Sequence, residues 1–307
     1  MDPYYVATIS ALVMYIIWCI KSSLNPARRS PPLPPGPRGL PILGYLPFLG
    51  NNLLHQFADL AQRYGPIYKL YLGNKLCVVI NSPSLVKEVV RDQDSIFADR
   101  DANIAALAAT YGGKDISFSP LNSEWRVMRK VFVREVLSHS SLQASYNLRK
   151  DEVRKAINRV YNDAGKPVHF GELSFRTELN VIMNLLWGGI VEGEECERLG
   201  EEVRDVVIKI VDLLGKPNIA DFFPVLARFD IQGIKKEMEG YVRTMERIFD
   251  DVIARCRKMS SGEITKEGKK DFLQVLLELK EKEDPEMPIS LSQIKAILMV
   301  SFVLFLR

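Results

Sequence analysis

Cysteine is scarce in this 307-residue sequence, and its cysteines are not grouped in a way that builds a scaffold. The four of them, Cys19, Cys77, Cys196 and Cys256, lie far apart, form no C-x-x-C pair and have no histidine nearby. Structural zinc sites and small disulfide-linked domains need closely spaced ligands or cysteine pairs. The sequence therefore excludes both classes and predicts a body that folds on an apolar core in a reducing compartment.

An excess of one charge is also absent. The 41 lysines and arginines stand against 38 aspartates and glutamates, for a net charge of +3, and no basic stripe is interleaved with aromatic residues. Nucleic acid is therefore excluded as the expected partner. No N-x-[ST] glycosylation site occurs, which agrees with a cytosolic body. With 47% apolar and 26% charged residues, the composition is that of a protein with a core.

The N-terminus carries the longest stretch without charge, YYVATISALVMYIIWCI at residues 4–20, followed by Lys21, Arg28 and Arg29. At about 1.5 Å per residue the stretch spans roughly 25 Å, close to the thickness of the thin endoplasmic reticulum bilayer. The basic side stays in the cytosol. A cleaved signal peptide is the alternative, but the basic segment before the apolar run and an A-x-A-like cleavage site are missing. Residues 1–21 are therefore expected to be a single-pass anchor in membrane lipid.

Short elements follow the expected anchor. Residues 22–48 are rich in proline and predict a stiff linker, because proline fixes φ and resists helix formation. The run LLHQFADLAQRYG has helical periodicity and ends on Gly65. The run PIYKLYLGNKLCVVINS contains two β-rich stretches that meet at a Gly-Asn pair, which predicts a hairpin. Pro83 then opens a helix.

The rest of the sequence is mainly helical. Residues 101–120 are rich in alanine and glycine without strong periodicity, so a mobile loop is expected there. Apolar periodicity predicts helices at 123–137, 142–163, 171–187, 194–214, 231–259 and 271–280. The fold class is therefore mainly α with a small β-sheet near the start.

Four stretches follow one another along the chain: PPGP behind the anchor, YGPIYKLYLGNKLCVVINSPSLVKEVV, the W-x-x-x-R of Trp125 and Arg129, and NIADFFPVLARFDIQG. In this order they resemble the cytochrome P-450 superfamily, the haem-thiolate monooxygenases, and within it the plant microsomal type that hydroxylates terpenoids and flavonoids. The resemblance implies that residues 49–299 are the N-terminal part of the cytochrome P-450 fold, up to the start of its central helix.

Trp125 and Arg129 are spaced i and i+4, so a helix places the indole N–H and the guanidinium on one face, where both can reach one anionic group. An amphipathic surface helix with an exposed arginine is the alternative. The resemblance implies that these two residues meet the haem propionates.

The resemblance also implies a substrate pocket capped by residues 101–120, with Ile116 and Phe118 in its lining. It implies an access channel near Phe222, Phe223 and Leu226. Each of these apolar side chains is equally consistent with an ordinary core position.

Two features of the family are missing. Its iron ligand is a cysteine in F-x-x-G-x-R-x-C-x-G, whose thiolate favours O–O cleavage, and no cysteine here has that context. An E-x-x-R pattern belongs on a late helix. It occurs here only before the expected central helix, as chance matches at Glu88 and Arg91, Glu195 and Arg198, and Glu201 and Arg204.

The stretch ISLSQIKAILM resembles the start of that central helix, with Ser290 or Ser292 as its N-cap. After Met299 the family pattern gives way to VSFVLFLR, so residues 300–307 are interpreted as an aberrant tail, either translated intron or the product of a truncation or frameshift. Without further helices, those at 171–187, 194–214 and 231–259 are expected to expose apolar faces.

By resemblance, the activity is a monooxygenase reaction that inserts one oxygen atom from O2 into a small hydrophobic plant metabolite. It uses haem and electrons from an NADPH-dependent reductase at the endoplasmic reticulum membrane. This chain is expected to be inactive as written, because the haem-ligand cysteine is missing. The alternatives are a membrane-anchored, non-catalytic fragment that acts by binding, and a tethered helical protein unrelated to haem.

Overall fold

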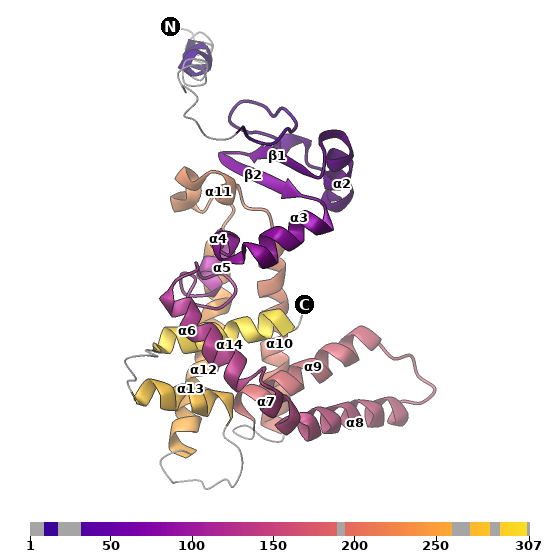
Figure 1. The fold of residues 1–307 in the computed structure, drawn as a ribbon. Helices are drawn as coiled ribbons and strands as arrows, with labels where there is room; N and C mark the ends of the chain where they lie inside the picture. The colour runs from indigo at the N-terminus through magenta and orange to yellow at the C-terminus, as the bar shows by residue number, and fades with distance from the viewer. Residues whose placement is uncertain (1–8, 18–31, 189–193, 260–270, 283–288, 306–307) are drawn as a thin grey trace. The chain divides into compact units, whose positions relative to one another are not determined.

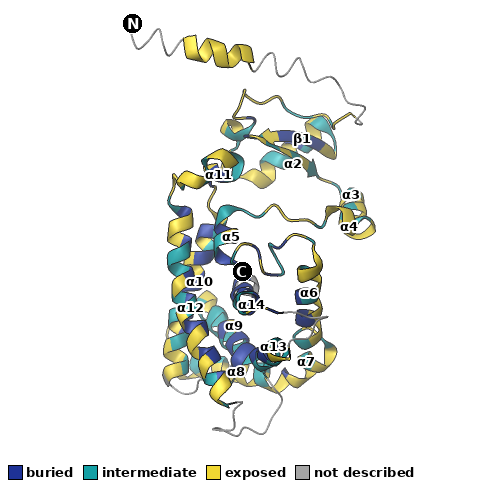
Figure 2. Ribbon diagram, turned by 90° about the vertical axis from the view of Figure 1, so that its left-hand side faces the viewer, coloured by how far each residue is buried: buried dark blue, intermediate teal, exposed yellow. Residues whose placement is uncertain are grey.

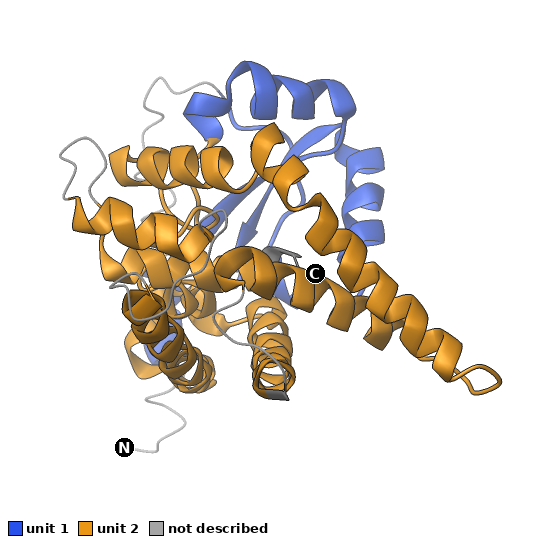
Figure 3. Cartoon of the chain, turned by 90° about the horizontal axis from the view of Figure 1, so that it is seen from below, with its two compact units in different colours: residues 1–97 blue, residues 98–307 orange. Residues whose placement is uncertain are grey.

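The computed structural model describes residues 9–17, 32–188, 194–259, 271–282 and 289–305. It divides the chain into two compact units, residues 1–97 and residues 98–307, which are coloured separately in Figure 3. Of the expected anchor, residues 9–17 are described and are helical, and the other residues of 1–21 lie outside the described part, as do linker residues 22–31. No described helix combines the length and the apolar character needed to cross a membrane.

The first unit is built on a hairpin of β1 (Ile67–Leu72) and β2 (Lys75–Ile80). Leu72 pairs with Lys75, so Gly73 and Asn74 form the two-residue turn, and Gly73 has the positive φ of 57° that such a turn needs. The predicted hairpin is confirmed. Around it lie η1 (Leu46–Phe48), α2 (Leu53–Tyr64), α3 (Pro83–Lys87), the π-helical turn η2 (Glu88–Asp92) and α4 (Asp94–Phe97) (Figure 1).

Helix α2 packs on β1 through a small core of Leu60, Tyr68 and Leu70, and the Tyr68 hydroxyl donates to the Phe57 carbonyl at 3.0 Å. Gly65 ends α2 with a φ of 101°, as predicted. Ser82 caps α3 by accepting a hydrogen bond from the Leu85 N–H. Both ends therefore form where local sequence chemistry places them.

Part of the proline-rich segment is attached to the sheet and is no free spacer. The Lys69 N–H donates to the Pro35 carbonyl at 2.9 Å, and the Tyr45 N–H donates to the Tyr71 carbonyl at 2.6 Å. A Cβ on Gly36 would lie 1.8 Å from the Lys69 carbonyl oxygen. Glycine is therefore required where this segment crosses β1, and from Pro35 onward the expected linker belongs to the first unit.

The second unit is a bundle of helices around α14 (Leu291–Phe305), which Figure 2 shows end-on among its neighbours. In chain order the helical elements before it are α5 (Ile104–Ala109), α6 (Ser123–Glu135), α7 (His139–Ala144), α8 (Tyr146–Asn162), α9 (Phe170–Trp187), α10 (Glu194–Gly215), α11 (Ile219–Phe222), η3 (Pro224–Phe229), α12 (Ile234–Lys258) and α13 (Phe272–Glu281). The mainly helical fold class is confirmed. The helix expected at 142–163 is broken at Ser145 into α7 and α8.

The expectation of a loop without structure at 101–120 is wrong, because α5 lies within it. The Asn103 side chain caps α5 by accepting from the Ala106 N–H at 2.7 Å. Ala105, Ala106 and Ala109 are almost completely buried, and α5 packs against α12 and α10. Small side chains let the helix backbones approach closely, so tertiary packing stabilises a segment that has no clear amphipathic pattern.

Helix α14 continues beyond Met299 into the residues interpreted from the sequence as an aberrant tail. Val300, Ser301, Phe302 and Val303 are helical and buried in the main core. The predicted cap is present, since Ser290 Oγ accepts from the Gln293 N–H at 3.2 Å. Residues 306–307 of the expected tail lie outside the described part.

The apolar faces of α9, α10 and α12, which were expected to be exposed, are covered by one another and by α14. Leu186 on α9 is 3% exposed, and Ile210 on α10 and Phe249 on α12 are 0% exposed. An exposed apolar stripe is found instead on α8, which extends with α9 away from the other helices (Figure 1). Val153 and Ile157 on α8 are 49% and 60% exposed.

Candidate functional site

Helix α6 presents the predicted pair of Trp125 and Arg129. The Asn122 side chain caps this helix by accepting from the Trp125 N–H at 2.8 Å, which fixes where the first turn begins. The Arg129 guanidinium carbon lies 5.3 Å from the centroid of the Trp125 ring, so the i, i+4 spacing brings the two side chains into cation–π contact. Arg129 is exposed, and among the described residues it forms no ion pair with a carboxylate.

The indole N–H of Trp125 has a partner that sequence reasoning did not find. Trp125 Nε1 donates to the Ile116 carbonyl oxygen at 2.9 Å. In this structure the indole N–H is therefore directed at the segment before α6, whereas the guanidinium of Arg129 retains its donors for an anion. Trp125 thus donates its N–H to a backbone carbonyl and presents its ring face to the Arg129 guanidinium.

Asp115 organises the segment that supplies this carbonyl. Its side chain is 1% exposed, and its two carboxylate oxygens accept the N–H groups of Ser117 and Phe118 at 3.0 Å each. Burial raises the pKa of the Asp115 carboxyl above its usual value, although the backbone donors act in the opposite direction. Sequence reasoning missed Asp115. The available signal was an aspartate in a turn-forming stretch, because an aspartate side chain commonly accepts the backbone N–H of the residue two positions later.

The two residues predicted to line a substrate pocket lie close to this turn. Ile116 is partly buried against the main core, and Phe118 is half-buried outside that cluster. Their side chains are thus in an intermediate environment that suits either a core or a pocket wall.

The predicted access-channel residues lie in α11 and η3. Phe222 ends α11, Phe223 follows it, Leu226 lies in η3, and all three are half-buried. Their segment is tied to the start of α5, because the Ile104 N–H donates to Asp221 Oδ1 at 2.8 Å. The structure thereby brings the predicted channel segment next to the segment expected to cap the pocket.

The start of α14 is joined to the start of α6 by polar side chains. Gln293 is 6% exposed, and its Nε2 donates to Glu124 Oε2 at 3.1 Å. Lys114 Nζ donates to Ser292 Oγ at 3.3 Å. The first turn of α6, which carries Trp125, is therefore connected to the central helix.

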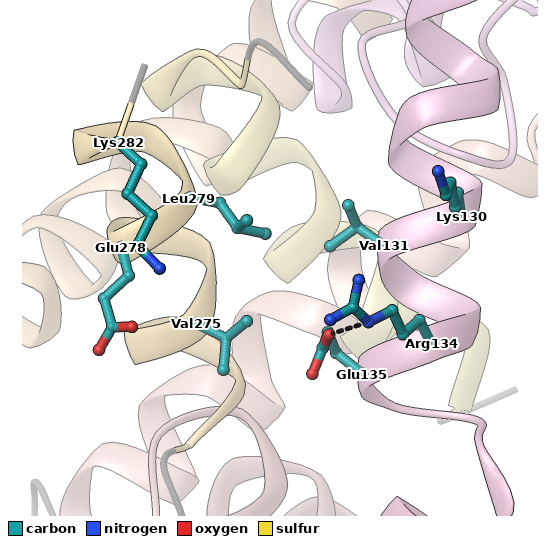
Figure 4. Close-up of a pocket in the computed structure, with 8 residues that line it drawn as sticks. All are labelled: Lys130, Val131, Arg134, Glu135, Val275, Glu278, Leu279 and Lys282. Carbon is teal, nitrogen blue, oxygen red and sulfur yellow. Dashed lines mark ion pairs between the residues drawn. The ribbon is translucent and has the colours of Figure 1, made fainter. Parts of the chain in front are cut away.

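A cavity of about 230 Å³ separates α6 from α13 (Figure 4). Val131, Val275 and Leu279 form its apolar part, between the two helices. Its charged rim contains Lys130, Arg134, Glu135, Glu278 and Lys282. Arg134 Nε is 3.0 Å from Glu135 Oε1, so part of this charge is already paired.

A second hollow of about 420 Å³ lies where the end of α6, the starts of α7 and α8, the end of α9 and the start of α13 meet. Its lining is mixed, with Val136, Leu148 and Phe272 beside Ser145 and Asp271. Neither hollow contains a residue that the sequence singled out as functional.

The described cysteines do not form a metal site. Cys77 lies in β2, Cys196 in α10 and Cys256 near the end of α12, and burial raises the pKa of the Cys256 thiol to about 11. Cys19 lies outside the described residues. Within the described part of the chain, His, Cys, Asp and Glu side chains form no group of three placed to hold a metal ion.

Two arginines and one glutamate of the E-x-x-R matches form ion pairs outside the motif. Arg91 contacts Asp92, Arg204 contacts Glu172, and Glu195 contacts Arg255. The partner of Glu195 is thus on α12, more than one helix away in sequence. These contacts agree with chance matches on charged helices.

Comparisons with known proteins identify the family. The Cytochrome P450 family model matches residues 34–303. Cytochrome P450 93A3 of Glycine max is 33% identical over 301 residues, which are 96% of this chain and 58% of that protein. A ferruginol synthase of Isodon rubescens is 30% identical over 283 residues, which are 91% of this chain and 56% of that protein.

A solved structure agrees on the fold. A zebra fish cytochrome P450, determined with progesterone, superposes with a TM-score of 0.65 at 19% identity, and the match covers 83% of this chain and 56% of that one. This chain therefore spans less than three fifths of the length of these relatives. A family model that matches most of the chain, relatives along its length and a shared helical fold lead to one conclusion: the chain belongs to the cytochrome P450 family.

Proposed function

We propose that this chain corresponds to the N-terminal part of a haem-thiolate monooxygenase, in which Arg129 binds a haem propionate. The observation that supports this proposal is the exposed Arg129 guanidinium, which rests on the Trp125 ring and has no carboxylate partner among the described residues. A planar guanidinium matches a carboxylate through two parallel hydrogen bonds. An arginine held on an aromatic ring loses less freedom when it binds an anion than one in open solvent.

The residues of the site fit the propionates of a haem but do not supply the thiolate ligand of its iron. Arg129 supplies the charge and the N–H donors for a propionate, whereas the Trp125 N–H is already donated to Ile116. An axial thiolate is not supplied by the described cysteines, since Cys256 is buried with its pKa raised to about 11 and the other two lie in a strand and a charged helix. A haem held by a cysteine thiolate would supply the oxygen-activating chemistry of the family. By this proposal the chain as written holds a propionate and does not catalyse oxygenation.

The proposed substrate of the complete enzyme is a small hydrophobic plant metabolite, oxidised with O2 and electrons from an NADPH-dependent reductase. Similarity to ferruginol synthases and a sugiol synthase supports the terpenoid class. Ile116 and Phe118 are proposed for the pocket wall, and Phe222, Phe223 and Leu226 for the access channel. The hydrogen bond from Ile104 to Asp221, which joins the two segments, supports this arrangement.

Residues 1–21 are proposed to anchor the protein in the endoplasmic reticulum membrane, with the body facing the cytosol. This part of the proposal depends on the charge-free sequence and its basic flank, because the structure describes only residues 9–17 of it.

Titration of the full chain with ferric haem, followed by absorbance, tests the role of Arg129. Loss of a charge-assisted hydrogen bond worth about 1.5 to 3 kcal/mol predicts that Arg129→Ala weakens haem binding about 10- to 100-fold. Arg126→Ala is the matched control, because it removes the same charge from an exposed position of the same helix. We expect the control to bind haem as the unmodified chain does.

Haem dimethyl ester separates propionate recognition from nonspecific apolar binding. Its propionates carry no charge, so the difference between Arg129→Ala and the unmodified chain should disappear with it. Equal weakening by Arg126→Ala and Arg129→Ala, or an Arg129 effect that persists with the ester, would show that Arg129 is not the propionate ligand.

A further inference from the structure

The peptide group between Ile116 and Ser117 is held from both of its sides. Its N–H, which belongs to Ser117, donates to Asp115 Oδ2 at 3.0 Å. Its carbonyl, which belongs to Ile116, accepts from Trp125 Nε1 at 2.9 Å. Because the peptide unit is planar and trans, its N–H and C=O point in opposite directions. Orienting the N–H toward Asp115 therefore orients the carbonyl toward Trp125.

The carboxylate of Asp115 is unusual in its surroundings. It is 1% exposed, and its hydrogen bonds come from backbone N–H groups of the neighbouring residues, including Ser117 and Phe118. A buried carboxylate without a cation costs free energy unless hydrogen bonds compensate for the lost water. Asp115 forms no ion pair within the described part of the chain, and its carboxylate instead holds the backbone of its own turn.

Two further contacts connect the Ile116–Ser117 peptide to Arg129. The Ile116 carbonyl holds the indole ring by its N–H, and the ring face lies 5.3 Å from the Arg129 guanidinium. An indole that lost its acceptor would be free to change rotamer about χ1 and χ2. The guanidinium would then lose the surface on which it rests.

We propose that Asp115 is a positioning residue for the Trp125–Arg129 pair, and that it acts by fixing the peptide between Ile116 and Ser117. This inference rests on the proposed function only for what Arg129 binds. The effect of Asp115 on the Trp125 side chain follows from the contacts alone and can be measured without haem.

Indole nitrogen NMR measures the proposed contact directly. The chain contains three tryptophans, Trp18, Trp125 and Trp187, and Trp125→Phe assigns the resonance of Trp125. In Asp115→Asn the isosteric amide turns a donor toward one of the two N–H groups, which releases the peptide. We expect the Trp125 indole resonance to shift and its N–H to exchange with solvent about tenfold faster, as loss of a hydrogen bond predicts.

Asp99→Asn is the matched control. Asp99 also accepts a backbone N–H of the segment before α6, that of Leu121 at 3.1 Å, but it is exposed and does not contact the Ile116 peptide. It should leave the Trp125 resonance unchanged. Trp187 is 2% exposed in the main core and reports on the fold as a whole. An unchanged Trp125 resonance in Asp115→Asn would overturn the inference.

A second variant is needed if Asp115→Asn disturbs the whole fold and shifts the Trp187 resonance as well. Asp115→Ser keeps a short acceptor that can form a weaker turn of the same kind. The inference requires Trp125 to shift in this variant while Trp187 stays in place. If both resonances move again, or neither does, Asp115 has no specific positioning role.

Haem titration then distinguishes the inference from the proposed function. Asp115→Asn should weaken haem binding in the unmodified background and have no further effect together with Arg129→Ala, because it acts through that residue. If Arg129→Ala leaves haem binding intact while Asp115→Asn shifts Trp125, the proposed function fails and the inference stands. If Arg129→Ala weakens binding but Asp115→Asn leaves Trp125 unchanged, the inference fails and the function stands.

Discussion

Phe302 lies against Trp187, with ring centroids 5.3 Å apart, and this contact joins the central helix α14 to α9. Phe302 also stacks on Phe249 of α12 with centroids 6.4 Å apart. All three rings are buried in the main core. Trp187 and Phe249 also contact each other, with centroids 6.2 Å apart, so the three rings form one closed cluster that joins α9, α12 and α14.

Truncating this ring should destabilise the chain strongly. Phe302→Ala removes a fully buried side chain and leaves a cavity, for which a loss of about 3–5 kcal/mol in the free energy of unfolding is expected. Urea unfolding followed by circular dichroism measures it. Phe170→Ala, at a position that is 76% exposed, makes the same chemical change and should alter stability by less than about 0.5 kcal/mol. Similar losses in both variants would contradict the packing seen at Phe302.

The cap of α5 provides a second stability prediction. Asn103 accepts from the Ala106 N–H at 2.7 Å and donates to the Leu214 carbonyl at 3.2 Å. Asn103→Ala removes both hydrogen bonds and should cost about 1–2 kcal/mol in the free energy of unfolding. Asn103→Ser retains the cap but cannot reach Leu214, so its loss should be smaller. A serine variant as unstable as the alanine variant would show that the cap contributes little.

The ion pair between α10 and α12 should make stability depend on pH. The hydrogen bonds from Arg255, at 2.7 and 2.9 Å, lower the pKa of the Glu195 carboxyl. A lowered pKa means that the folded state favours the carboxylate, so its stabilisation is present above about pH 4.5 and is lost as pH falls through the folded pKa. Glu195→Gln should lower the melting temperature at pH 7 and have a smaller effect near pH 3.

Glu197→Gln is the control for this pH dependence. Glu197 is 3.9 Å from Arg159, a long contact between exposed groups. It should therefore change the melting temperature little at either pH. A Glu195 effect that is the same at pH 3 and pH 7 would mean that charge is not responsible.

Asp115 should produce the opposite pH dependence. Its pKa is raised because burial penalises the carboxylate, so the folded state binds a proton more tightly than the unfolded state does. As pH rises from about 4 through the folded pKa, the contribution of Asp115 to the free energy of unfolding falls. Asp115→Asn removes this slope. Urea unfolding at several pH values between 4 and 7 compares the unmodified chain with Asp115→Asn. Parallel curves of unfolding free energy against pH would contradict the raised pKa.

The buried thiol of Cys256 should react slowly. With a pKa of about 11, its thiolate fraction at pH 8 is about 100-fold smaller than that of a thiol of pKa 9. Iodoacetamide labelling of the folded chain, followed by mass spectrometry, should modify the partly exposed Cys196 well before Cys256. Unfolding in urea should remove the difference. Equal labelling rates in the folded chain would contradict the burial of Cys256.

Local chemistry was readable in the sequence where a few adjacent residues decide the conformation. Gly73 and Asn74 predict the hairpin turn and Gly65 the end of α2, and the structure confirms both. The sequence offers Ser290 or Ser292 as the cap of α14, and the structure shows that it is Ser290. The spacing of Trp125 and Arg129 likewise predicts that they share one face of α6, and the structure places the guanidinium over the indole ring. In each case the chain needs no distant partner to adopt the predicted geometry.

The sequence did not predict the elements whose conformation depends on contacts with distant segments. The alanine-rich sequence of α5 does not alternate apolar and polar residues with a helical period. The helix forms because α12 and α10 cover it. Ser145 breaks a helix that periodicity extends from 142 to 163, and residues 35–48 pair with β1 although proline suggests a spacer. Apolar burial and interstrand hydrogen bonds each require two segments, so the sequence of one segment alone does not predict them.

The sequence by itself determined the mainly helical class, the hairpin, the end of α2 and the family, because these depend on short-range spacing and on motifs in order. Only the tertiary structure decided that Asp115 is buried, that the Ile116 carbonyl takes the Trp125 N–H, and that Phe302 closes an aromatic cluster with Trp187 and Phe249. The physical reason is that desolvation and ring packing act on whatever side chains the fold brings together, at any separation in sequence.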